Sequence, residues 1–96
     1  MRATTLTVMI YDVTCNRRRA RLHALLKQYG VRVQWSAFEA RLTPRERDRL
    51  LRRAEQLIEV STDRLIVYAI SAKAESSIVC FGRPRPRIAE EGFYLV

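Results

Sequence analysis

Several residue types are scarce in this chain of 96 residues, which has only two cysteines, one histidine and three glycines. Cys15 and Cys80 show no C-x-x-C spacing, which excludes a zinc-binding cysteine cluster and indicates reduced thiols. Glycine-rich phosphate loops and G-x-S-x-G elbows are absent. Apolar runs are only a few residues long, and the chain does not begin with a signal-like segment. The sequence therefore predicts a cytoplasmic protein without a membrane segment.

Lysine is scarce too, although the chain is strongly basic. Eighteen lysines and arginines oppose ten acidic residues, for a net charge of +8, and only Lys27 and Lys73 are lysines. Arginine presents a planar fork that binds phosphate oxygens through two hydrogen bonds, so this excess favours a nucleic-acid partner. GC-rich coding bias, which favours arginine without any function, is the alternative explanation.

The length leaves room for one domain with a modest core. A domain of this size buries a limited share of its surface, and we therefore expect a homodimer. Residues 1–82 are predicted to form the folded domain, and residues 83–96 an Arg/Pro arm followed by a C-terminal strand.

The N-terminal third has the pattern of a strand followed by a helix. Residues 5–13 alternate with period two and are rich in β-branched side chains, which predicts a strand that ends near Asp12. Thr14 and Asn16 offer side-chain caps for the helix that follows. Gly30 stands where a left-handed residue commonly ends a helix.

Residues 31–42 return to an extended pattern. Twelve residues are long for one strand, so we expect two short strands or one sharply bent strand, with a break near residues 34–36. Thr43 and Glu46 then form a capping box around Pro44, which predicts the start of a second helix.

Three extended segments follow in the C-terminal third. Residues 65–70 and 78–81 are predicted strands, with Cys80 in the core, and residues 93–96 would add to a sheet edge, such as that of the partner subunit. The order strand, helix, strand, strand, helix, strand predicts an α+β fold, the ferredoxin-like βαββαβ sandwich, with extra C-terminal strands.

Asp12 is the strongest candidate for chemistry, because it lies at the carboxyl end of the first strand, before an arginine-rich turn. Mg²⁺ often takes only one or two carboxylates and completes its shell with water and phosphate. One Asp12 from each protomer, brought together across a dimer axis, would make an adequate site. A turn or helix-capping aspartate is the alternative.

Arginines crowd two places in the sequence. Cations near a helix N-terminus oppose the helix macrodipole, so the first cluster favours an anionic ligand over local stability. The second alternates with prolines in the Arg/Pro arm, a stiff segment that could follow a nucleic-acid backbone, dock a partner protein or be a solvated connector. The predicted nucleic-acid contacts are Arg17, Arg18, Arg19 and Arg21 in the first cluster and Arg83, Arg85 and Arg87 in the second.

Three further polar residues have weaker claims. His23 is interpreted as a surface or boundary residue, and Cys15 lacks a neighbouring base that would make it a nucleophile. Glu39 is interpreted as a strand-edge ion-pair partner rather than a second metal ligand.

Four segments together resemble CRISPR-associated protein 2, a small protein of CRISPR spacer acquisition. They are Ile10–Val13, Leu26–Gly30, Val31–Glu39 and Leu42–Pro44, and Trp35 stands where the family usually has tyrosine. The resemblance implies a ferredoxin-like homodimer that bridges CRISPR-associated protein 1, the partner integrase, and holds double-stranded DNA. It also implies that paired Asp12 residues can hold Mg²⁺, and that some members are metal-dependent endonucleases on single-stranded RNA or duplex DNA.

Other functions remain open. A toxin-type RNA interferase could use the same fold, and a purely non-catalytic DNA-binding scaffold would need no metal. An RNA-binding module would need base-stacking aromatics on its central strands, and residues 37–41 do not fit that pattern. The charge makes a small-molecule regulatory domain the poorest choice.

Overall fold

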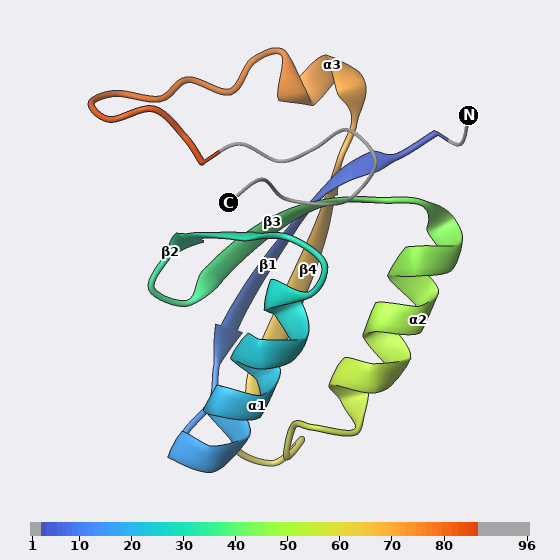
Figure 1. Cartoon of the computed structure of the whole chain (residues 1–96), viewed down its shortest axis with the longest axis vertical. Coiled ribbons are helices and arrows are strands. Elements are labelled where there is room, and N and C mark those ends of the chain that lie inside the picture. Colours follow the sequence, from blue (N-terminus) through green and yellow to red (C-terminus); the bar gives the residue numbers. More distant parts are fainter. Residues whose placement is uncertain (1–2, 87–96) are drawn as a thin grey trace.

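A computed structural model of the chain describes residues 3–86, in which a four-stranded antiparallel sheet carries two long helices on one face (Figure 1). The strands are β1 (Thr5–Asp12), β2 (Val31–Gln34), β3 (Ala37–Leu42) and β4 (Arg64–Ile70), in the order β2-β3-β1-β4. The helices are α1 (Asn16–Lys27), α2 (Pro44–Glu55) and the short α3 (Ala72–Glu75). This is the ferredoxin-like arrangement that the sequence predicted.

Alternation along β1 gives the sheet two different faces. Met9 and Tyr11 point toward the helices and are buried, in a core that includes Leu22, Leu26 and Phe38. The intervening residues of β1 point to the other face, which lacks a helix of comparable length among the described residues. Apolar side chains remain exposed there, with Ile10 at 40% and Tyr68 at 49%.

The two long helices begin in different ways. At α2 the predicted capping box is confirmed: the Glu46 amide donates to Thr43 Oγ1 (3.2 Å) and the Thr43 amide donates to Glu46 Oε1 (2.8 Å). The predicted caps of α1 are wrong, because Cys15 is the N-cap and makes no side-chain cap bond. Instead, the Thr14 hydroxyl donates to Asp63 Oδ1 (3.4 Å), and Asn16 Oδ1 accepts from the Arg19 guanidinium.

The predicted break near residues 34–36 is confirmed as the turn of the β2–β3 hairpin. The Tyr11 amide donates to the Ser36 carbonyl oxygen (3.0 Å), which fixes this turn against the end of β1. The expected left-handed conformation of Gly30 is wrong, since only Gly82 among the described residues has a positive φ. Gly30 is needed for space: a Cβ there would lie 2.1 Å from the Glu39 carbonyl oxygen.

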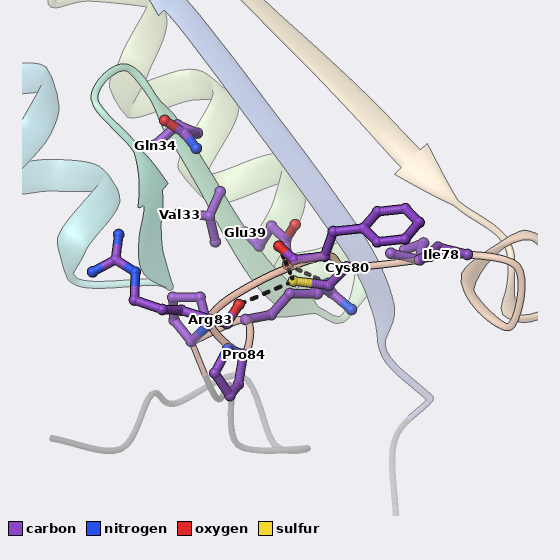
Figure 2. Close-up of a pocket in the computed structure, with 11 residues that line it drawn as sticks. Val33, Gln34, Glu39, Ile78, Cys80, Arg83 and Pro84 are labelled. Atoms are coloured by element: carbon purple, nitrogen blue, oxygen red, sulfur yellow. Dashed lines mark hydrogen bonds and ion pairs between the residues drawn. The ribbon is translucent and has the colours of Figure 1, made fainter.

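The predicted strand at residues 78–81 is also wrong. After β4, Ser71 caps α3 by accepting from the Ala74 amide (3.1 Å), so the chain turns away from the sheet. Residues 78–86 then cross beside β2 and β3 without regular structure (Figure 2), and Cys80 is exposed rather than in the core. The predicted strand at residues 93–96 lies outside the described residues, and the division at residue 82 stays a prediction.

Candidate nucleic-acid interface and strand-end carboxylate

Asp12 is exposed at the carboxyl end of β1, where its Cα pairs in register with that of Arg64 on β4. It follows Tyr11, which points into the core, so the Asp12 carboxylate belongs to the face of the sheet without the long helices. Residues 3–86 give this carboxylate no hydrogen-bond or ion-pair partner. An exposed carboxylate without an internal partner is available to a ligand.

Asp63 is an acidic residue that serves the fold rather than a ligand. Its side chain is fully buried between the segment after α2 and the start of α1. It pairs with the Arg18 guanidinium (Nε to Oδ2, 2.8 Å) and accepts from the Glu59 amide (2.8 Å) and the Thr14 amide (3.3 Å). The Arg18 hydrogen bond, with these amides, holds the pKa of Asp63 well below its usual range. Asp63 therefore fixes the turn that carries Asp12 into α1.

The four arginines predicted to bind phosphate on α1 have different surroundings. Arg18 is held by Asp63, and Arg19 donates to the Val13 carbonyl oxygen (2.6 Å) and to Asn16 Oδ1. Arg17 and Arg21 are exposed. Arg18 and Arg19 thus organise the β1–α1 turn, and the other two are the more available for a ligand. The phosphate contacts of all four stay a prediction.

The described part of the Arg/Pro arm, residues 83–86, is attached to the sheet through Arg85, whose guanidinium pairs with Glu39 on β3. The ion pair expected for Glu39 is therefore confirmed, but it forms on an inner strand of the sheet rather than at a strand edge. Residues 78–86 and the β2–β3 hairpin enclose a cleft of about 680 Å³ (Figure 2), beside which the Cys80 thiol donates to the Arg83 carbonyl oxygen (Sγ to O, 3.2 Å). Arg83 is exposed, and Arg87 lies outside the described residues.

The described part of the chain could bind a metal ion through single carboxylates but not through a cluster of ligands. Residues 3–86 contain no group of three or more histidine, cysteine, aspartate or glutamate side chains placed to hold a metal. Mg²⁺ can nevertheless bind through one or two carboxylates with water and phosphate, so the isolated, exposed Asp12 fits such a site if a second chain contributes another.

Two other titratable groups lie near this end of the sheet. The backbone amides of Arg18 and Arg17 lower the pKa of the Cys15 thiol. Burial of the His23 ring on α1, which contacts Phe38 of β3 edge-on, lowers its pKa, and the charges of Arg32 and Lys27 act in the same direction. His23 is half-buried, which confirms its interpretation as a boundary residue.

Sequence reasoning missed two pairs that shape this surface. Asp63 pairs with Arg18 across 45 positions, and no local pattern signals a contact of that separation. Arg32 stacks its guanidinium over the Trp35 ring at 4.5 Å from the ring centroid. The spacing of these two residues across a predicted turn was the available signal for the second pair.

Fold and surface together define a class: a small, basic, ferredoxin-like protein with an exposed aspartate at the end of its central strand. Residues 5–78 match the family model of CRISPR associated protein Cas2, and the chain belongs to that family. Helices long and apolar enough to cross a membrane are absent from the residues that the structure describes.

Relatives and solved structures agree with this assignment. The chain is 39% identical over 84 residues to the CRISPR-associated endoribonuclease Cas2 of Mycobacterium tuberculosis, covering 88% of this chain and 72% of that one. It resembles the crystal structure of Streptococcus pyogenes Cas2 with a TM-score of 0.71 and 28% identity, covering 80% and 99%. A chain of a partial Cas6-RT-Cas1–Cas2 complex gives a TM-score of 0.69 at 27% identity, covering 80% and 84%.

Proposed function

We propose that the chain works as a homodimer of the CRISPR adaptation machinery that binds nucleic acid and hydrolyses phosphodiester bonds with the help of Mg²⁺. The observation that carries the proposal is the position of Asp12. Its carboxylate is exposed at the end of the central strand, while the neighbouring acidic residue Asp63 is buried in an ion pair. Asp12 is therefore the carboxylate that this end of the sheet presents to a ligand.

Nucleic-acid binding is supported by the charge and by its placement. The chain carries a net charge of +8, and Arg17 and Arg21 lie exposed on the helix that follows Asp12. Arg17 lies in the first turn, where a cation is unfavourable to the isolated helix, and bound phosphate would offset that cost. In this proposal, Arg17 and Arg21 bind the phosphate backbone of the nucleic acid. The phosphate that they place beside Asp12 is the one that is hydrolysed.

In the proposed dimer, Asp12 of each protomer would hold one Mg²⁺ between the two chains. A bound Mg²⁺ supplies Lewis-acid stabilisation of phosphate charge and a more acidic water. The chain's own contribution is to place the carboxylates. The Asp63–Arg18 pair and the Tyr11–Ser36 hydrogen bond hold the end of β1 in position from two sides.

The relatives indicate the substrates and partners to test. The Mycobacterium tuberculosis relative is named an endoribonuclease, and the structural neighbour belongs to a complex with Cas1. We accordingly propose single-stranded RNA and double-stranded DNA as substrates. The proposed partner is the integrase CRISPR-associated protein 1, which the dimer would bridge during spacer acquisition.

The test compares the unmodified protein with Asp12→Asn, which keeps the size of the side chain and removes its charge. Asp48→Asn is the matched control, because Asp48 is an exposed aspartate on α2. Labelled single-stranded RNA and duplex DNA are incubated with each protein in Mg²⁺ and in EDTA. Cleavage by the unmodified protein and Asp48→Asn in Mg²⁺ alone, abolished in Asp12→Asn, is the expected result. Tight binding without cleavage in any condition would instead favour a non-catalytic scaffold.

A further inference from the structure

Trp35 is an unusual surface residue. It lies in the turn of the β2–β3 hairpin and is 81% exposed, although it is the only tryptophan of the chain. Neither the core nor the strand-end carboxylate accounts for it. A large aromatic ring left in water at a functional end of a protein is a candidate contact for a ligand.

The ring is held in place by its neighbour. Arg32 donates through its Nη2 to the Trp35 carbonyl oxygen (2.8 Å) and through its Nε to the same oxygen (3.1 Å). These bonds fix the guanidinium 4.5 Å from the centroid of the Trp35 ring. Arg32 thus occupies one side of the indole and, because the residue is so exposed, the ring remains accessible from elsewhere. The stacked guanidinium restricts the ring, which reduces the entropy that the ring loses on binding.

A cavity of about 320 Å³ opens beside this ring, at the lower end of the roughly 300–1,000 Å³ usual for ligand sites. Trp35 and Arg32 form its hairpin side, α1 lines it with Arg19 and His23, and Tyr11 lines it from β1. None of its lining side chains is acidic. The charges of Arg32 and Arg19 also act on the Tyr11 hydroxyl, where they partly offset the rise in pKa caused by burial. The environment is aromatic and positive.

Location connects the cavity with the nucleic-acid interface. The Tyr11–Ser36 hydrogen bond joins the hairpin turn to the end of β1, one residue before Asp12. Tyr11 points toward the long helices and Asp12 away from them. The cavity and the Asp12 carboxylate therefore lie on opposite faces of the sheet, at the same end of β1. A flexible strand that leaves Asp12 can turn this corner more readily than a stiff duplex.

We propose that Trp35, backed by Arg32, stacks on an unpaired nucleobase of a bound strand. An indole face accepts any base, and a positive cavity without carboxylates suits the phosphates on either side of that base. The inference rests on the proposed nucleic-acid binding and adds a preference for single-stranded segments or frayed duplex ends.

The test uses the fluorescence of the only tryptophan. The protein is titrated with an end-labelled oligothymidylate, with an abasic strand of equal phosphate number, and with a blunt duplex, while label anisotropy reports binding. The oligothymidylate is expected to quench Trp35, whereas the abasic strand should bind with similar salt dependence and leave the emission unchanged. Trp35→Ala is expected to weaken oligothymidylate binding by at least about 5-fold, and Trp35→Phe by less. Neither substitution should alter binding of the abasic strand.

Four results would overturn the inference. Saturation with oligothymidylate without any change in Trp35 emission, or equal affinities for Trp35→Ala and the unmodified protein, would show that no base stacks there and would leave the proposed function intact. Quenching that follows protein concentration alone would mean that a second copy covers the ring. Failure of all three nucleic acids to bind would overturn the proposed function, and base stacking with it.

Discussion

Gly30 offers a test of how closely α1 and the hairpin pack. A Cβ at this position would lie 2.1 Å from the Glu39 carbonyl oxygen and 2.7 Å from the Ala40 Cβ. Both contacts belong to β3, an inner strand of the sheet, and Ala40 is fully buried. Neither atom is the end of a flexible side chain, so relief of the clash requires a shift of backbone.

We expect Gly30→Ala to destabilise the fold by about 2 kcal/mol net. Overpacking a well-packed core costs about 1–3 kcal/mol, and a clash with strand backbone belongs near the upper limit of that range. Replacing glycine restores about 0.4–1 kcal/mol through the unfolded chain, which leaves about 2 kcal/mol. For a domain of this size, that destabilisation lowers Tm by roughly 8–16 °C, measured by circular dichroism.

Gly30→Asn separates the steric cause from a conformational one. Asparagine tolerates the left-handed conformation, so it would be better than alanine if Gly30 were needed for its backbone angles. Since asparagine carries the same Cβ, the clash predicts a Tm at least as low as that of Gly30→Ala. At Gly82, where φ is +91° and a Cβ would meet nothing within 4 Å, asparagine should be better than alanine. An unchanged Tm in Gly30→Ala would refute the steric reasoning.

Three further predictions test other parts of the structure. Asp63→Asn should lower Tm at neutral pH, because it removes the charge that pairs with Arg18. In the unmodified protein, folding lowers the pKa of Asp63, so stability is lost as the pH falls below the ordinary aspartate value of 3.8. Asp63→Asn should reduce that loss. His23→Gln should flatten the fall in Tm from pH 7 to 5, since burial lowers the folded-state pKa and the unfolded chain binds the proton more tightly. Arg17→Ala with Arg21→Ala should reduce the salt slope of duplex binding by roughly 0.9 for each phosphate that the protein no longer neutralises, whereas Arg49→Ala with Arg52→Ala, on α2, should leave it unchanged. Each expectation has a result that would contradict it. Asp63→Asn would keep its acid sensitivity, the Tm profile of His23→Gln would match that of the unmodified protein, or the salt slope would be unchanged in the Arg17 and Arg21 variant.

Local patterns in the sequence predicted most of the secondary structure correctly. Period-two alternation located β1, and the capping box of Thr43 and Glu46 located the start of α2. The break in residues 31–42 followed from strand length alone. These signals act between near neighbours in the chain, and each is strong enough to hold in the folded protein.

The errors concern features that depend on distant parts of the chain. Residues 78–81 have β-forming side chains, but α3 directs them away from the sheet, so Cys80 is exposed. Gly30 has the position of a helix cap, yet glycine is needed there because β3 approaches too closely for a Cβ. The ion pair of Arg18 with Asp63, 45 residues away, is likewise a contact that no local pattern indicates.

The sequence also indicated only those parts of the candidate site that depend on neighbouring residues in the chain. Asp12 could be found because a carboxylate at the end of an apolar strand conflicts with its surroundings, and it is indeed exposed. Which arginines are available near it depends on tertiary ion pairs. The Arg32–Trp35 pair is formed across a hairpin turn whose geometry the sequence did not define.

A mixed dimer tests most directly whether two Asp12 residues act together. Unmodified and Asp12→Asn chains are co-expressed with different tags, and the mixed dimer is isolated by purification on both tags. Its Mg²⁺-dependent cleavage of labelled RNA and duplex DNA is compared with that of the unmodified dimer. If the two carboxylates hold one metal ion, the mixed dimer will cleave at far less than half the unmodified rate. Cleavage at half that rate would show that each Asp12 works alone, and would contradict the paired site.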